Sequence, residues 1–164
     1  QKKNFPISTP RFNKLKDDII SKKNIIKNAE ILLLEGWCCG SPSINKKYLF
    51  QNINRLETIV DKNKKWRQYY NSQLMKDYKK VFSLFDQQIY IQPPSFSYVL
   101  KWRYNQEKNN ALKSRTKDFM NKKDLQKFIQ HYEKLTKWMM KTMPAKADIL
   151  IKIDSNQKIK KVVI

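Results

Sequence analysis

The most continuous hydrophobic run in the chain covers residues 31–34, and Glu35 and Gly36 follow it directly. A run this short, apolar at every position and closed by glycine, is typical of a central parallel strand that is covered on both faces. Ligands of open α/β sheets bind at the carboxyl ends of such strands, so Glu35 is a candidate for holding a hydrated magnesium ion beside a phosphate. The alternative is a strand that ends in an ordinary exposed glutamate, and this short pattern leaves both interpretations open.

Hydrophobic residues recur every three or four positions in three other stretches, 49–60, 66–85 and 125–139. This spacing predicts amphipathic helices that pack on a sheet. The second stretch carries an aromatic stripe, which we expect to lie in the core and not to serve as a base-stacking platform. Asn121, followed three residues later by Asp124, indicates the N-cap of the third helix, and Pro144 should end that helix.

Short apolar runs predict further strands at 88–91, 147–153 and 159–164, and a helix is expected from about 97 to 113. Residues 1–13 contain Pro6 and Pro10, and we expect them to form a loop. Strands that alternate with helices imply crossover connections between parallel strands. The sequence therefore predicts an α/β fold with a mostly parallel sheet.

The composition is that of a chain with its own core, because 40% of the 164 residues are hydrophobic. We expect one domain over 1–164, with an extended segment at 1–30, a strand and turn at 31–40, and helices and strands at 41–164. No apolar run reaches the roughly 18 to 20 residues that cross a membrane, and no leader segment is evident. The adjacent Cys38 and Cys39 indicate neither a disulfide framework nor a zinc site. We expect a cytoplasmic protein that does not contact membranes.

The formal net charge of +21 suggests nucleic-acid binding, because lysine and arginine neutralise phosphates. Only five of the 35 basic residues are arginines, although bidentate contacts to phosphates and bases favour arginine. The charge is spread along the whole chain, and an excess of lysine is also what a GC-poor genome would encode. We therefore expect no specific nucleic-acid binding, and a basic nucleic-acid-binding module stays as an alternative function.

Two further groups of charged residues have a bland and a functional interpretation. Four cations follow the strand expected at 88–91 and would be able to reach a bound phosphate chain: Lys101, Arg103, Lys108 and Lys113. From this pattern alone, a solvated basic helix face is the favoured explanation. The pair Asp17-Asp18 either faces a substrate or caps a turn, and the pattern favours the turn.

Several segments together resemble the bacterial D-glycerate 3-kinase family, which belongs to the P-loop kinases with uridine kinase and phosphoribulokinase. Each motif is weak alone, but their order and spacing over about 10–154 are specific to this family. The segments are 10–14 (PRFNK), 34–38 (LEGWC), 66–69 (WRQY), 94–96 (PSF), 102–107 (WRYNQE), 128–136 (FIQHYEKLT) and 143–145 (MPA).

The resemblance implies a three-layer fold of the P-loop NTPase type and transfer of the γ-phosphate of ATP to a hydroxyl of D-glycerate, with Mg²⁺. It implies that Glu35 acts on magnesium through water or on the attacking hydroxyl. Substrate contacts would come from Arg11, Asp18 and Trp37. Arg103, Lys113 and Arg115 would close over the phosphates as part of a lid.

The chain departs from the family pattern at two positions and lacks one motif. Asn13 stands where the family has Asp, and Ile19 stands where it has Arg, which affects the expected substrate contacts. The glycine-rich loop that cradles phosphates in P-loop kinases is missing, since the chain has two glycines. In the family this loop precedes the segment at Pro10. We therefore expect the C-terminal part of a kinase, with an incomplete sheet and low stability alone, and a non-catalytic remnant is the other alternative.

Overall fold

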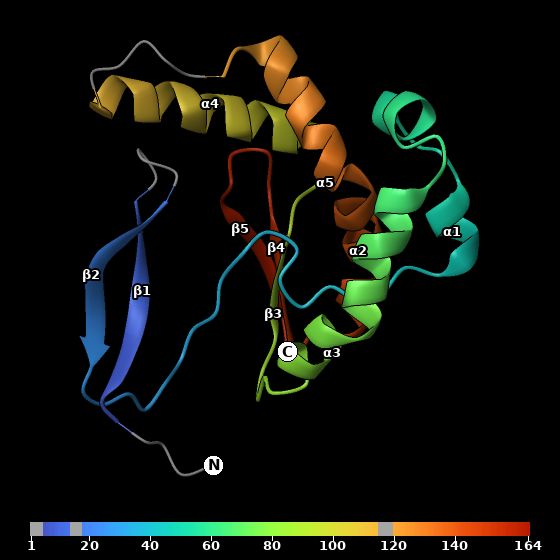
Figure 1. Cartoon of the computed structure of the whole chain (residues 1–164). Coiled ribbons are helices and arrows are strands. Elements are labelled where there is room, and N and C mark those ends of the chain that lie inside the picture. The colour runs from blue at the N-terminus through green and yellow to red at the C-terminus, as the bar shows by residue number, and fades with distance from the viewer. Residues whose placement is uncertain (1–4, 14–17, 115–119) are drawn as a thin grey trace. The chain divides into compact units, whose positions relative to one another are not determined.

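The computed structural model describes residues 5–13, 18–114 and 120–164 (Figure 1). The chain forms two compact units, Gln1–Gly36 and Trp37–Ile164. Among the described residues, no helix combines the length and the apolar character that a membrane span requires.

The first unit contains an antiparallel hairpin of β1 (Ile7–Asn13) and β2 (Asp18–Ile26). The expectation of a loop over residues 1–13 is therefore wrong for β1. Pro10 lies where the register shifts, between Thr9 and Arg11. Proline cannot donate to a strand ladder, but edge strands and irregular positions tolerate it. Two prolines in thirteen residues thus did not exclude a strand. Asp17 lies outside the described residues.

The apolar run at 31–34 is not a strand, so the sequence prediction at this position is wrong. Its four side chains are exposed at 79%, 85%, 84% and 57% in chain order. A central strand exists only where neighbouring strands satisfy its backbone and cover its side chains. No described residue supplies such a pairing here, since the ladder pairs of this unit join only β1 and β2. The segment is an extended connection with an uncovered hydrophobic surface.

The second unit contains a three-stranded sheet in the order β3 (Ile89–Gln92), β4 (Ile149–Ile153), β5 (Ile159–Val163). All three strands were predicted. β3 and β4 are parallel, whereas β4 and β5 are antiparallel. The sheet among the described residues is therefore mixed and not mostly parallel. The turn between β4 and β5 explains the antiparallel pair. It is too short for the crossover connection that two parallel strands require.

Helix α5 (Lys122–Thr142) forms as its hydrophobic pattern predicts. The side-chain oxygen of Asn121 accepts a hydrogen bond from the backbone N–H of Asp124 at 3.0 Å. The helix ends in a 3₁₀ turn, η2 (Met143–Ala145), which contains Pro144. Its buried residues are Leu125, Ile129, Lys134, Thr136, Trp138 and Met139.

The remaining helices are mostly shorter than predicted. The stretch 49–60 splits into α1 (Lys46–Phe50) and a π-helical turn, η1 (Leu56–Val60). The stretch 66–85 splits into α2 (Lys65–Met75) and α3 (Asp77–Phe82), because Lys76 has the non-helical angles φ −110° and ψ −88°. The helix predicted at 97–113 is present as α4 (Ser97–Ser114).

The aromatic stripe of α2 and α3 is not the core element that its spacing predicted. Leu74 is buried, but Trp66 is 70% exposed and Tyr78 is 52% exposed. Helix α3 has no buried residue. Helical spacing places these side chains on one face, but no described element covers that face along its length.

Two small hydrophobic clusters form the core of the second unit, and α5 contributes to both. The first joins β3, β4 and the end of α5 through Tyr90, Met139, Met143 and Leu150. The second joins α5 to the segment around α1 through Ile44, Leu49 and Trp138. Helix α4 lies across the end of the sheet (Figure 1), where the indole N–H of Trp102 donates to the carbonyl of Ser155 at 3.1 Å.

A buried ion network ties η1, α2 and α5 together. Arg67 and Lys134 are each 1% exposed, and Glu57 and Asp61 are each 4% exposed. The guanidinium Nε of Arg67 lies 2.8 Å from Asp61, and its Nη1 lies 3.5 Å from Glu57. The ammonium group of Lys134 lies 3.2 Å from Glu57 and also donates to two backbone carbonyls, those of Tyr48 and Gln51. Two cations thus balance two anions in this network, which the sequence pattern did not indicate.

Candidate functional site

Trp37 lies at the start of a tight turn that precedes the helical part of the second unit. Its ring stacks on Tyr132 of α5, with centroids 4.5 Å apart and planes inclined by 15°. Its indole N–H donates to the hydroxyl of Thr136 at 2.9 Å. The side chain is still 41% exposed, so one part is fixed against α5 and the rest is available to a ligand.

The turn after Trp37 requires unusual backbone angles. Cys38 has φ +64° and Gly40 has φ +75°. A Cβ atom at Gly40 would collide with the side-chain amide of Gln88, next to the start of β3. That amide is the end of a flexible side chain, so the left-handed φ of Gly40 is the constraint that favours glycine at this position.

Cys38 is partly buried beside Thr136, with its sulfur 3.8 Å from the hydroxyl oxygen. Burial raises the pKa of this thiol to about 11, although the contact with Thr136 opposes the shift. The thiol is therefore protonated at neutral pH and is a poor nucleophile or metal ligand.

Arg103 lies in the first half of α4 and is held by its own helix. One guanidinium nitrogen lies 2.6 Å from the carboxylate of Glu107, and another donates to the amide of Gln106 at 2.9 Å. Its Nε is buried without a hydrogen-bond partner among the described residues. The ends of the guanidinium are thus paired within α4, whereas Nε is left unsatisfied.

The other predicted residues of the first unit are exposed. Arg11 lies in β1, opposite Ile20 of β2. Asp18 opens β2, where its carboxylate accepts the N–H of Ile19 at 2.6 Å. Glu35 is exposed at the end of the apolar run. The hairpin register brings Arg11 and Asp18 onto neighbouring strands, two positions apart, and Glu35 follows on the irregular segment.

The lid residues Lys113 and Arg115 fall at the edge of the described structure. The backbone of Lys113 belongs to α4. Its side chain and the whole of Arg115 lie outside the described residues. Their role stays a prediction.

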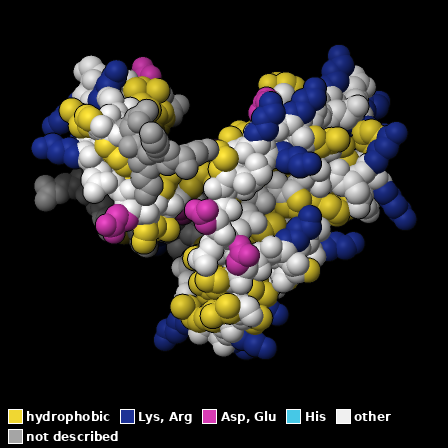
Figure 2. Space-filling view, turned by 90° about the horizontal axis from the view of Figure 1, so that it is seen from below, with side chains coloured by type: hydrophobic (Ala, Val, Ile, Leu, Met, Phe, Trp, Pro, Cys, Tyr) yellow, Lys and Arg dark blue, Asp and Glu magenta, His cyan; other side chains and the backbone are white. Residues whose placement is uncertain are grey.

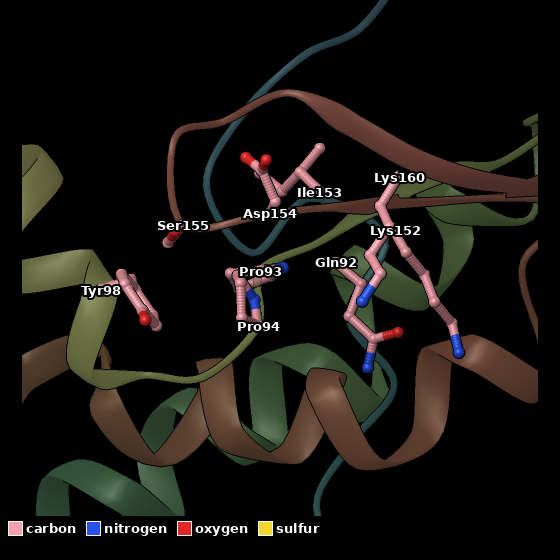
Figure 3. A pocket seen from close by; sticks show the side chains of 9 residues that line it. All are labelled: Gln92, Pro93, Pro94, Tyr98, Lys152, Ile153, Asp154, Ser155 and Lys160. Atoms are coloured by element: carbon pink, nitrogen blue, oxygen red, sulfur yellow. The ribbon is translucent and has the colours of Figure 1, made fainter.

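A cavity of about 480 Å³ lies where the parallel strands β3 and β4 end (Figure 3). Three segments supply its walls, namely the end of β3 with the two prolines after it, the first turn of α4, and the β4–β5 hairpin. The lining residues are Gln92, Pro93, Pro94, Tyr98, Lys152, Ile153, Asp154, Ser155 and Lys160. The carboxyl end of parallel strands is where α/β sheets bind ligands. None of these residues was predicted, although polar and proline residues directly after two expected strands were a usable signal.

Asp154 organises the hairpin on one side of this cavity. Its carboxylate accepts the backbone N–H groups of Asn156 and Lys158 at 2.8 and 2.9 Å. These hydrogen bonds lower the pKa of the carboxyl below its usual 3.8. Asp154 is therefore ionised at neutral pH and is committed to the turn between β4 and β5.

Basic side chains lie at many separate points of the face seen in Figure 2, with hydrophobic side chains between them. Among the described residues, no group of three or more His, Cys, Asp or Glu is placed to hold a metal ion. The described surface thus offers no metal cage made by the protein alone.

Two solved structures resemble this chain. A D-glycerate 3-kinase from Cryptococcus neoformans var. grubii matches 96% of this chain with a TM-score of 0.71 at 18% identity. A structure of the YGR205w protein matches 99% of it with a TM-score of 0.64, also at 18% identity. In both cases the chain spans 59% of the solved chain.

One curated relative is an uncharacterized kinase, mug58, from Schizosaccharomyces pombe. It is 24% identical over 139 residues, which are 77% of this chain and 47% of the relative. No family model matches the chain. The chain thus spans about half the length of this relative.

These matches define the class to which the fold belongs. Nearly the whole chain shares the α/β fold of these two solved structures. The resemblance to D-glycerate 3-kinase that the sequence predicts is confirmed at the level of this fold.

Proposed function

We propose that the protein is an ATP-dependent kinase that phosphorylates a hydroxyl of a small metabolite, and that D-glycerate is this metabolite. The observation that carries the proposal is the match of 96% of the chain to a D-glycerate 3-kinase fold. The ordered motifs from Pro10 to the segment 143–145 support the same substrate. The cavity at the carboxyl ends of β3 and β4 lies at the sheet edge where such folds bind ligands.

Magnesium would neutralise charge on the phosphates during transfer. Mg²⁺ usually keeps several waters and takes one or two carboxylates together with substrate phosphates. A single exposed carboxylate such as Glu35 fits this mode better than it fits a full protein cage. We assign Glu35 to the magnesium through water, or to the attacking hydroxyl as a proton acceptor.

The substrate contacts come from Arg11, Asp18 and Trp37 in this proposal. Arg11 is an exposed guanidinium, which suits the carboxylate of D-glycerate through charge-assisted hydrogen bonds. Asp18 has a second carboxylate oxygen beyond the one that accepts Ile19, and a substrate hydroxyl suits it. The ring of Trp37 is partly exposed, so it is available for contact with a substrate.

Arg103 would stabilise the phosphates after its guanidinium leaves Glu107 and binds a phosphate oxygen. Its guanidinium now contacts Glu107 at 2.6 Å, and this partner would be exchanged for a phosphate oxygen. The exchange replaces one charge-assisted contact by another, so it costs less than exposing an unpaired cation. Lys113 and Arg115 would add further positive charge from the same region of the chain.

The exposed segment 31–34 belongs to the same proposal. Its four uncovered apolar side chains are suited to a strand between two neighbours, and the matched kinases contain substantially more chain than this one. We assign the segment to a strand that forms when additional polypeptide supplies the adjacent strand and the nucleotide loop. This strand would hold Glu35 in place.

The test is D-glycerate-dependent ADP formation by the complete product of the reading frame that encodes residues 1–164. We expect activity that requires ATP, magnesium and D-glycerate. Glu35→Gln should lower kcat by about 10²- to 10⁴-fold, the usual contribution of a proton-transfer group. Glu30→Gln, an exposed acid of the same segment, is the matched control and should retain activity.

A second arm uses residues 1–164 alone and should give no turnover. Turnover by these residues alone would contradict the need for additional polypeptide. Absence of D-glycerate-dependent activity in the complete, folded product would contradict the substrate. Polynucleotide binding that weakens steeply with salt would then favour the nucleic-acid alternative.

A further inference from the structure

Two consecutive helices, α2 and α3, carry aromatic rings on the surface of the second unit. Trp66 and Tyr69 of α2 are 70% and 60% exposed, and Tyr78 of α3 is 52% exposed. The helical spacing predicted burial of this stripe, and burial argued against a base-stacking role. That argument does not hold for exposed rings. Exposed hydrophobic surface rimmed by polar residues typically marks a binding site.

The rings form two pairs that leave flat aromatic surface open. Trp66 and Tyr69 meet edge to face, with centroids 6.4 Å apart and planes inclined by 87°. In this geometry the ring that presents its edge keeps both of its faces uncovered by the other ring. Tyr78 and Phe82 form a second pair on α3, with centroids 5.7 Å apart and planes inclined by 35°. Each helix therefore offers aromatic surface of the kind on which nucleic-acid bases stack.

Helix α2 is held firmly, so the backbone that carries its rings is fixed. Its inward face consists of Arg67, Asn71 and Leu74, which are buried. Arg67 belongs to the buried ion network. The side-chain amide of Asn71 accepts the N–H of Ile44 at 2.7 Å and donates to the carbonyl of Ile44 at 3.1 Å. A platform that is already ordered loses little conformational entropy when a ligand binds to it.

The charge of the same stretch is almost wholly positive. Residues 62–85 contain six lysines, at positions 62, 64, 65, 76, 79 and 80, and Asp77 is the single acid among them. Asp77 pairs with Lys80 at 3.5 Å, and both side chains are largely exposed, so this pair is weak. None of the other five lysines takes part in a salt bridge among the described residues. The stretch therefore has positive charge available to a polyanion.

The combination of rings and lysines favours one kind of polyanion. An acidic peptide or a nucleic-acid duplex would use the charge but not the rings, because neither presents free bases. A membrane surface requires a helix with a continuous apolar face, whereas the exposed Lys65 and Gln68 separate the rings of α2. A single-stranded polynucleotide alternates bases with phosphates, and it would use both the rings and the lysines.

We propose that the exposed face of α2 and α3 binds single-stranded polynucleotide without sequence preference. Bases stack on Trp66, Tyr69 and Tyr78, and the lysines of the stretch 62–80 contact the phosphates. Stacking on rings is sequence-tolerant, because every base has a flat aromatic face. The site shares no residue with those assigned to phosphoryl transfer, so it stands independently of the proposed kinase function.

The experiment titrates a fluorescently labelled oligouridine with the complete product of the reading frame and measures fluorescence anisotropy at several salt concentrations. Trp66→Leu, Tyr69→Leu and Tyr78→Leu each remove one ring. Phe12→Leu, which removes a 55% exposed ring of β1, is the matched control. All four positions are exposed, and circular dichroism with thermal unfolding checks that each variant folds as the parent protein does.

Each ring variant on α2 or α3 should weaken oligouridine binding about five- to a hundredfold, the range for losing one stacked base. Trp66→Phe should retain most of the affinity, because it keeps a ring. Phe12→Leu should bind oligouridine as the parent protein does.

Lysine variants test the charge separately from the rings. Lys65→Met and Lys79→Met should each reduce the slope of log affinity against log salt by about 0.7, the value for one phosphate contact of a single strand. Lys123→Met removes an exposed lysine at the start of α5 and should keep the parent slope. Polyglutamate and an RNA duplex should compete weakly for the protein, since they offer charge without free bases.

Three outcomes would overturn the inference. The first is the absence of oligouridine binding to the folded complete product, and the second is ring variants that weaken binding no more than Phe12→Leu does. The third is binding of polyglutamate or anionic lipid vesicles that is as tight as binding of oligouridine. Turnover of D-glycerate, measured on the same preparations, keeps the two proposals apart. Turnover without oligouridine binding contradicts this site alone, whereas ring-dependent binding without turnover supports this site and contradicts the kinase proposal.

Discussion

Helix α5 and the segment 31–34 are both rich in hydrophobic residues, but they differ completely in burial. Leu125 of α5 is fully buried, at 0% exposure, whereas Leu33 is 84% exposed. The helix has one apolar and one polar face, so its own sequence pattern specifies which face is buried. The sheet and the segment around α1 pack against this apolar face. The segment is apolar at every position and depends on strands that the described residues do not supply.

The difference shows what hydrophobicity does and does not specify. An amphipathic pattern predicts both an element and the face that packs. An apolar run predicts that something must cover it, but not which part of the chain does so. Exposed runs of this kind mark interaction surfaces. Substitutions in the buried and the exposed regions should therefore differ widely in their effect on stability.

The buried ion network should carry the largest effect. Arg67→Met removes one cation, which leaves Asp61 buried without its cationic partner and leaves Glu57 with Lys134 alone. We expect a loss of about 3–5 kcal/mol in the free energy of unfolding, the range for breaking a buried ion pair. Urea denaturation measures it. Lys137→Met breaks a more exposed pair with Glu133 on α5 and should cost under about 1 kcal/mol. Equal effects of both variants would contradict the network.

The two leucines test the contrast directly. Leu125→Ala should lower the free energy of unfolding by about 2–5 kcal/mol, because it leaves a cavity under α5. Leu33→Ala in the isolated 164-residue chain should change it by no more than about 0.5 kcal/mol. Denaturant midpoints at constant slope give both values. A large loss for Leu33→Ala would mean that the segment is covered in solution.

The acid stability of the second unit should depend on Asp61. Burial alone raises the pKa of this carboxyl, but hydrogen bonds from Arg67 and two backbone N–H groups outweigh burial and lower the pKa below 3.8. The unfolded chain therefore binds a proton more readily than the folded chain. The resulting stabilisation is complete above the unfolded pKa of 3.8 and is lost as pH falls through the folded pKa.

Unfolding midpoints measured from neutral pH down to below the folded pKa check this dependence. Asp61→Asn should start less stable at neutral pH and lose less stability on acidification than the parent protein. Parallel pH curves for the two proteins would contradict the assignment.

Trp37 should give the smallest effect. Trp37→Phe keeps a ring against Tyr132 but removes the hydrogen bond to Thr136. We expect a loss of about 1 kcal/mol, the net value of one such hydrogen bond. Thermal unfolding measures it, and Trp66→Phe, at a 70% exposed position, is the matched control and should have no effect. A loss no larger than in the control would contradict the role of the hydrogen bond.

The sequence predicted the elements whose signals are local. The Asn121 cap, the face of α5, and the strands at β3, β4 and β5 follow from spacing and from turn residues a few positions away. The predictions were wrong where the local structure depends on residues that are distant in the sequence. β1 forms because β2 pairs with it, and the covering of residues 31–34 depends on strands elsewhere. The helix break at Lys76 was not predicted, because no glycine or proline lies at that position.

The candidate site was harder to predict than the fold. Trp37 was named through family resemblance, and the structure adds its fixed orientation against Tyr132 and Thr136. The cavity with Lys152 and Lys160 depends on strand pairing and on a bulge, and neither is visible in residue spacing. Two lysines in a chain this rich in lysine carry no signal until the sheet brings them together.

Amide hydrogen exchange at residues 31–34 is the most direct test of the proposed strand. In residues 1–164 alone we expect these amides to exchange as freely as in an unstructured peptide, while the amides of α5 are protected. When the chain is joined to the part of the Cryptococcus kinase that it does not match, the same amides should become protected. Protection in the 164 residues alone, or free exchange in an active longer protein, would contradict the proposal that this segment becomes the strand that holds Glu35.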